Sequence, residues 1–126
     1  MRRSIAVTAA LATALVATAW SPSVAEAGTN NSVWSAGHVN EASFVAYGDD
    51  LFNCDYTADG HHAVVQWVDG RDPGKVHTAR NKGGNGTCTN ALAGVNLAEG
   101  SGIAFHSCIG EGTRIYSCGP DVTAVA

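Results

Sequence analysis

The chain has few basic residues and no cluster of them. Seven of its 126 residues are Lys or Arg, against eleven Asp or Glu, and two of the seven are Arg2 and Arg3. From residue 28 onward, five basic residues stand against ten acidic ones, a net charge of −5. Nucleic acids and anionic membranes bind proteins through clustered Lys and Arg side chains. We therefore expect no nucleic-acid partner and, once the N-terminal segment is removed, no membrane partner.

Motifs that carry enzyme or metal chemistry are also missing. The chain has no G-x-S-x-G nucleophile elbow, no C-x-x-C pair, and no H-x-H or H-E-x-x-H motif. Its glycine-rich segment, residues 81–86 (NKGGNG), lacks the Gly-Lys-Ser/Thr of a phosphate-binding loop. We therefore expect no catalytic residue, no metal ligand and no cofactor, and we do not expect an enzyme.

A long uncharged apolar run occurs only near the N-terminus. It spans residues 5–20, follows Arg2 and Arg3, and precedes a small-x-small pattern at residues 25–27 (AEA). This order is typical of a secretory signal peptide, and 16 residues are few for a membrane-spanning helix. We predict a helical signal peptide over residues 1–27 and one secreted, extracellular domain over residues 28–126.

The rest of the chain has the pattern of short strands. No segment after residue 27 repeats apolar residues with a helical period between caps, so no helix is expected there. Segments rich in β-branched and aromatic residues instead alternate with turn residues every 8–12 positions. They occupy residues 42–47, 51–56, 63–68, 75–80, 103–108, 114–118 and 122–125, and residues 33–36 are a further candidate. We predict an all-β fold, a small antiparallel β-sandwich of the immunoglobulin-like or a related type.

The alternation of side chains along each strand predicts which residues face the core. In residues 63–68 (AVVQWV), Trp67 falls on the face opposite Gln66, so we expect Trp67 in the core and Gln66 on the wetter face. In residues 103–108 we expect Ile103 and Phe105 to point inward and His106 outward. The polar segment 75–80 suits a sheet edge. Residues 87–97 are expected to form a loop that leads into a short strand.

All four cysteines, Cys54, Cys88, Cys108 and Cys118, follow the predicted signal peptide. An even number in an oxidising compartment predicts two disulfides, and four cysteines allow three pairings. A turn at residues 110–112 (GEG) would bring two strands side by side. This geometry favours a bond between Cys108 and Cys118, which leaves Cys54 for Cys88. In the loop-entropy model, these bonds contribute about 3 and about 4 kcal/mol respectively.

Three other segments suggest functional sites only weakly. The adjacent pair His61 and His62 suggests a metal site together with His38, His77 and His106, but neighbouring residues on a strand point to opposite faces. Residues 55–60 (DYTADG) match a calcium loop at Asp59 alone, and a turn accounts for that match. Residues 69–75 (DGRDPGK) could form a rigid loop like those of secreted inhibitors, although Pro-Gly also makes an ordinary turn.

Five short motifs occur in order along most of the secreted part. They are residues 48–52 (GDDLF), 59–64 (DGHHAV), 84–88 (GNGTC), 98–100 (AEG) and 103–108 (IAFHSC). In these motifs the chain resembles the small secreted, two-disulfide proteins common in mycelial actinobacteria, a group without an assigned function. The resemblance concerns turns and cysteines. It therefore bears on the fold and carries over no catalytic or binding residue.

Taken together, these observations predict a secreted, non-catalytic binding or envelope-associated module, present as a monomer. Its expected partner is an extracellular protein or a carbohydrate. An alternative is a secreted inhibitor of an extracellular hydrolase, such as a protease or an amylase. A weaker third possibility is a small secreted enzyme.

Overall fold

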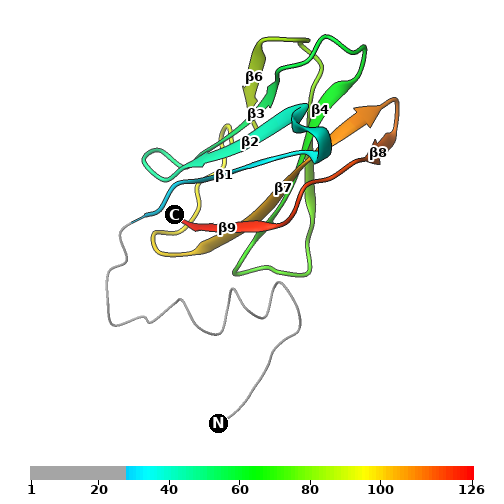
Figure 1. The fold of residues 1–126 in the computed structure, drawn as a ribbon. Helices are drawn as coiled ribbons and strands as arrows, with labels where there is room; N and C mark the ends of the chain where they lie inside the picture. Colours follow the sequence, from blue (N-terminus) through cyan, green and yellow to red (C-terminus); the bar gives the residue numbers. More distant parts are fainter. Residues whose placement is uncertain (1–27) are drawn as a thin grey trace.

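In the part of the chain that the structure describes, nine strands form two antiparallel sheets that pack face to face (Figure 1). The computed structural model describes residues 28–126, and the predicted signal peptide, residues 1–27, lies outside the described residues. Within residues 28–126 the one helical element is the three-residue 3-10 turn η2 (Ala36–His38). None of the helical structure in this part is long and apolar enough to cross a membrane. The predicted all-β sandwich is confirmed.

The chain crosses between the two sheets three times. Sheet I has the order β1-β2-β3-β6, with β1 (Asn31–Trp34), β2 (Asn40–Val45), β3 (Asp50–Asp55) and β6 (Thr87–Asn90). Sheet II has the order β5-β4-β7-β8, with β5 (His77–Asn81), β4 (His62–Asp69), β7 (Gly102–Glu111) and β8 (Arg114–Tyr116). The last strand, β9 (Val122–Val125), also pairs with β7. Strands β8 and β9 therefore follow one another along the same edge of β7 (Figure 1).

The core lies between the sheets and contains the residues that the strand alternation predicts. Trp67 is 5% exposed, and Ile103 and Phe105 are 0% and 1% exposed. The rings of Phe44 on β2 and Phe105 on β7 meet across the two sheets at 6.5 Å. Gln66 is half-buried on the opposite face of β4, as expected. The inward positions of Trp67, Ile103 and Phe105 are confirmed.

Buried asparagines connect the two sheets at one end of the core. Asn40 on β2 donates through its side-chain amide to the carbonyl of Cys108 on β7, at 2.9 Å. Asn53 on β3 donates in the same way to the carbonyl of Ala63 on β4, at 3.1 Å. Both asparagines are at most 1% exposed. Hydrogen bonds from buried amides therefore join the sheets in addition to apolar packing.

The prediction for residues 87–97 has the wrong order, because the strand comes first and the loop follows. Strand β6 pairs with β3 and places Cys88 opposite Cys54. The loop after it buries Leu92 and Leu97, which are 2% and 3% exposed, in the core. These apolar residues fill one side of the sandwich from a loop, and period-two alternation does not apply to a loop.

The hairpin turn is shorter and later than predicted. Strand β7 continues to Glu111 and pairs it with Arg114, so the turn consists of Gly112 and Thr113. Gly110 belongs to the strand. A side chain at that position would collide with His62 and Val64, which lie over it from β4. Glycine at position 110 therefore makes room for a neighbouring side chain instead of making the turn.

Candidate functional site

Each disulfide crosses two neighbouring segments on the outer face of one sheet, and neither joins the sheets. Cys54 on β3 is bonded to Cys88, its direct partner on β6. Cys108 on β7 is bonded to Cys118, in the link after β8. This is the pairing that hairpin geometry favours. Two disulfides in a small domain are compatible with an extracellular protein.

Cys118 lies in an irregular link between β8 and β9. Three residues of β7, 106–108, face five residues of the link, 117–121, so the link bulges from the sheet edge. Ser117 adopts a left-handed conformation, with φ of 52°. Two hydrogen bonds flank Cys118: the Ala36 amide donates to the Ser117 carbonyl at 3.0 Å, and the Gly119 amide donates to the Ser107 carbonyl at 2.9 Å. The backbone around Cys118 is therefore held by hydrogen bonds as well as by the disulfide.

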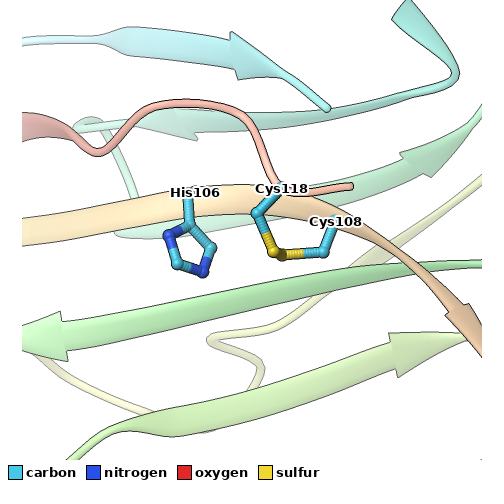
Figure 2. Close-up of side chains that lie close together, drawn as sticks. All are labelled: His106, Cys108 and Cys118. Carbon is cyan, nitrogen blue, oxygen red and sulfur yellow. A yellow bond between two sulfur atoms is a disulfide. The ribbon is translucent and has the colours of Figure 1, made fainter. Parts of the chain in front are cut away.

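His106 lies beside this disulfide on the same face of β7 (Figure 2). Its Nδ1 is 2.6 Å from Oδ1 of Asp121 in the link, and its Nε2 is 2.9 Å from Oε1 of Gln66 on β4. The Gln66 amide nitrogen donates to Oγ1 of Thr78 on β5, at 3.2 Å. A row of hydrogen-bonded side chains thus crosses the outer face of sheet II from the link to β5. Within this row, Asp121 and Gln66 contact the two nitrogens of the His106 ring from opposite sides.

The partners of His106 can accommodate two protonation states of its ring. A carboxylate oxygen and an amide oxygen only accept hydrogen bonds, so with Gln66 in this orientation both ring nitrogens donate and the ring is an imidazolium. A neutral ring requires the Gln66 amide to turn over, so that its nitrogen donates to Nε2. In that case the Thr78 hydroxyl can donate to the amide oxygen. Both charge states therefore have a complete set of partners.

Metal binding is limited by the disulfide. In the part of the chain that the structure describes, the one group of His, Cys, Asp or Glu side chains close enough to share an ion is His106, Cys108 and Cys118. Their potential ligand atoms lie within 4.8 Å of one another. The two sulfurs are bonded to each other, so neither offers the thiolate that binds zinc or copper.

The four other histidines have separate partners and do not converge. The Trp34 ring stacks on His38 at 5.0 Å and the Trp67 ring stacks on His77 at 3.9 Å. His61 meets the ring of Tyr116 edge-on, whereas His62 contacts the Arg80 guanidinium. The adjacent pair in the sequence is therefore divided between two different surroundings, in agreement with the alternation of strand side chains.

His62 and Arg80 form a second contact on the outer face of sheet II. Nη1 of Arg80 is 2.7 Å from Nε2 of His62, and because Arg can only donate, this nitrogen of His62 accepts. Burial lowers the pKa of His62, and the positive charge of Arg80 lowers it further, followed by smaller contributions from Lys82 and His61, while Asp55 acts in the opposite direction. The guanidinium also donates to two carbonyl groups of the hairpin turn.

Aromatic rings gather at one end of the sandwich. Trp34 ends β1, His38 ends η2, and Tyr56 follows β3, so three separate segments contribute. The Trp34 ring stacks on His38 with an angle of 10° and meets Tyr56 at 5.5 Å with an angle of 41°. Tyr56 is 47% exposed. We call Trp34, His38 and Tyr56 the aromatic trio.

Further rings lie among the loops at the same end. Arg114 lies 4.6 Å above the ring of Tyr116 on β8, which in turn meets His61 from the β3–β4 connection. His38 has a positive φ of 58°, a conformation uncommon for residues other than glycine. A backbone amide of η2, that of Ala36, bonds to Ser117 just after β8. The loop ends of both sheets are thus joined at this end of the molecule.

The remaining candidate segments are turns. In residues 55–60, the Asp55 carboxylate accepts from the Thr57 amide, and Asp59 accepts from the His61 amide, each at 3.0 Å. These are Asx turns, in which the carboxylates bind local backbone amides. The glycine-rich segment 81–86 contains a similar turn, in which the Asn81 side-chain oxygen accepts a hydrogen bond from the Gly83 amide.

The loop of residues 69–75 is also compact. Asp69 accepts from the Arg71 amide at 2.9 Å and pairs with its guanidinium at 3.4 Å. Two backbone bonds, from Asp72 to Asp69 and from Lys75 to Asp72, form successive tight turns. The loop therefore does not present an extended backbone.

Sequence reasoning placed His106 on the outer face and among the candidate metal ligands, but it missed both its position beside the disulfide and the aromatic trio. The first left a readable signal, because His106 and Cys108 are two residues apart on a strand and so share a face. The aromatic trio depends on loop conformations, which leave no such signal in the sequence. Comparison with family models, with curated proteins and with solved structures finds no match. The resemblance to secreted actinobacterial proteins stays a prediction.

Proposed function

We propose that the protein is an extracellular, non-catalytic binding module and that the aromatic trio is its binding surface for carbohydrate. The observation that carries this proposal is the packing of Trp34 against His38 and Tyr56, from three separate segments, at one exposed end of the sandwich. Aromatic rings combine a large apolar face with a polar edge, and they are favoured at recognition surfaces for that reason.

The chemistry of the trio suits a sugar ring. The face of an aromatic ring is electron-rich, so it attracts the weakly positive C–H groups that line one face of a pyranose. Glu41 lies next to Trp34 across the β1–β2 pairing and offers a carboxylate to sugar hydroxyl groups. The positive φ of His38 is a second indication, since residues held in uncommon backbone conformations are concentrated at functional sites.

A non-catalytic role agrees with the surroundings of His106. Its Nδ1 contacts a carboxylate, as in a catalytic triad, but its Nε2 faces the amide of Gln66, where a triad has a hydroxyl or thiol nucleophile. The compact turns of residues 69–75 give no specific support to the inhibitor alternative.

Co-sedimentation with insoluble polysaccharides and purified cell walls tests the proposal. The protein should sediment with at least one of chitin, cellulose or peptidoglycan. Tyr56→Ala should weaken this binding about two- to tenfold, as expected for the loss of one stacked ring. Tyr47→Ala is the matched control, because Tyr47 is a lone tyrosine, 94% exposed, in the β2–β3 turn at the opposite end.

Two results would overturn the proposal. One is a protein that stays in the supernatant with every polysaccharide and wall preparation. The other is binding that Tyr56→Ala and Tyr47→Ala reduce equally. Retention by cell walls that survives removal of their polysaccharides would indicate a protein partner instead.

A further inference from the structure

The two disulfides differ in the charged group beside them. On the outer face of sheet I, Glu41 is the cross-strand neighbour of Cys54. On the outer face of sheet II, His106 precedes Cys108 by two residues and lies within 4.8 Å of both sulfurs. A carboxylate opposes the formation of a thiolate nearby, whereas an imidazolium stabilises it. Thiol–disulfide exchange releases a thiolate, so the two bonds should react at different rates.

The two sulfurs of the second disulfide also differ in access. Cys118 is exposed in the bulged link, and Cys108 is 0% exposed. A thiolate from solvent can therefore reach Cys118, and Cys108 becomes the leaving group. The buried leaving group is the sulfur that most needs a nearby positive charge, because burial penalises an unpaired thiolate.

His106 is held where it can supply that charge. Asp121 and Gln66 fix the two nitrogens of its ring, and Asp121 is the charged group that faces it from the link. On β5, Arg80 lies in the same cross-strand row as Cys108, with Val64 between them. Glu111 and Arg114 contact each other at the hairpin turn, beyond this row. Cys108 therefore has the imidazole of His106 on its own strand and the guanidinium of Arg80 across the sheet.

The backbone allows the bond to open and close again. The hydrogen bonds from the Ala36 amide to Ser117 and from the Gly119 amide to Ser107 flank Cys118 and do not depend on the disulfide. After reduction they keep the Cys118 segment against β7. While Cys118 carries the external thiol as a mixed disulfide, the nearby Cys108 thiolate can attack it, re-form Cys108–Cys118 and release the external thiol, because the effective concentration of one sulfur near the other is high.

We propose that Cys108–Cys118 is an exchange-competent disulfide that reacts with extracellular thiols, with Cys118 as the attacked sulfur and His106 as the group that stabilises the departing Cys108 thiolate. This activity lies beyond the proposed binding function and is independent of it. Cys54–Cys88 is the structural disulfide of the pair.

The reaction balances with two equivalents of thiol. A thiolate attacks Sγ of Cys118, a mixed disulfide forms there, and the electron pair of the broken bond goes to Cys108. The charge of the His106 imidazolium stabilises the Cys108 thiolate, which takes its proton from solvent. A second thiolate then attacks the sulfur of the bound thiol, which releases the small-molecule disulfide and leaves Cys118 reduced. The external thiol is oxidised, and the protein disulfide is reduced by two electrons.

Reduction by glutathione, followed cysteine by cysteine, tests the proposal. The folded, oxidised protein is incubated with glutathione, quenched with acid and alkylated, and each cysteine peptide is quantified by mass spectrometry. Cys108–Cys118 should open about tenfold faster than Cys54–Cys88 at neutral pH. The first product should carry glutathione on Cys118 and a free thiol on Cys108.

The ratio of the two rates isolates the role of His106, because both bonds meet the same concentration of glutathione thiolate. In His106→Gln, which replaces the imidazole with an uncharged polar side chain of similar size, the ratio should be several-fold lower at neutral pH than in the natural protein. Ser43→Gln, on the outer face of sheet I, controls for a surface substitution.

Each alternative outcome contradicts a stated part of the proposal. Equal rates for the two disulfides would overturn the exchange activity. A glutathione adduct on Cys108 would overturn the assignment of the attacked sulfur. A ratio that is the same in His106→Gln as in the natural protein would remove His106 from the reaction. None of these readouts depends on carbohydrate binding.

Discussion

The outer faces of the two sheets carry the same kind of cross-link in different chemical surroundings. On sheet I, Cys54 and Cys88 are direct partners in a regular antiparallel pair, beside the carboxylate of Glu41. On sheet II, Cys108 is bonded to a cysteine in an irregular link, beside an imidazole that a carboxylate and an amide hold in place. Two cross-links of the same kind thus differ in the side chains beside them, and such neighbours influence the rate of thiol–disulfide exchange.

The largest effect is expected from removing each cross-link separately. In the loop-entropy model, Cys54→Ala/Cys88→Ala lowers the free energy of unfolding by about 4 kcal/mol, because this bond spans 34 residues. Cys108→Ala/Cys118→Ala lowers it by about 3 kcal/mol, because its bond spans 10. Urea unfolding of both double variants measures the difference. A larger loss from the second variant would show that bracing sheet II is the main task of Cys108–Cys118.

A smaller loss is expected where the link of sheet II touches sheet I. A side chain at position 119 would collide with the carbonyl oxygen of Trp34 at the end of β1. Gly119→Ala should therefore lower the free energy of unfolding by about 1–3 kcal/mol, as overpacking usually does. Thermal unfolding measures it. Gly74→Ala is the matched control, since a side chain at position 74 meets nothing within 4 Å. Equal effects of both substitutions would contradict the close contact.

A pH dependence is expected from His62 on sheet II. Its pKa lies below the unfolded value of 6.5, chiefly because of burial and then because of Arg80. The unfolded chain therefore binds the proton more readily than the folded one. The contribution of His62 to stability is full above pH 6.5 and is lost as the pH falls from there through the lowered pKa.

Urea unfolding at several pH values checks this prediction. The natural protein should lose stability on acidification, and His62→Gln, which cannot take up the proton, should lose less over the same range. The difference between the two curves is the quantity of interest, because it cancels the contributions of other titrating groups. Parallel curves would show that the Arg80–His62 contact does not respond to pH.

The smallest effect is expected from the carboxylate on sheet I. Glu41→Gln removes the negative charge beside Cys54 and should speed the opening of Cys54–Cys88 by glutathione about two- to threefold. Stability should change by less than about 0.5 kcal/mol, as for most surface substitutions. Glu99→Gln, in an exposed loop, is the control. An unchanged rate would mean that the difference between the disulfides comes from His106 alone.

Strand positions and facing were predictable because they follow from local alternation. The period of two placed Trp67, Ile103 and Phe105 in the core, and hairpin geometry favoured the observed cysteine pairing. The hairpin turn was predicted at the wrong position because Gly110 is required by a contact with His62, a residue 48 positions earlier, and not by the turn. Such a contact across strands leaves no periodic signal in the sequence.

The candidate sites were less predictable for the same reason. His106 acquires its role from Gln66, 40 residues before it, and from Asp121, 15 residues after it. The spacing of His106 and Cys108 indicates a common face, but only the bulged link brings Cys118 and Asp121 to that face. The aromatic trio depends on three loop conformations, which sequence patterns describe least well.

The ends of the described chain meet at the side of the sandwich opposite the aromatic trio. The Thr29 amide donates to the Val125 carbonyl at 2.9 Å, and the Val125 amide donates to the Thr29 hydroxyl at 3.0 Å. From there β1 runs the length of the sheet to Trp34, as Figure 1 shows. The molecule could therefore be attached to a tag, a carrier protein or a solid support through either of these ends, and the aromatic trio on the opposite side would stay accessible. The same proximity of the ends makes the domain suitable for insertion into a loop of another protein.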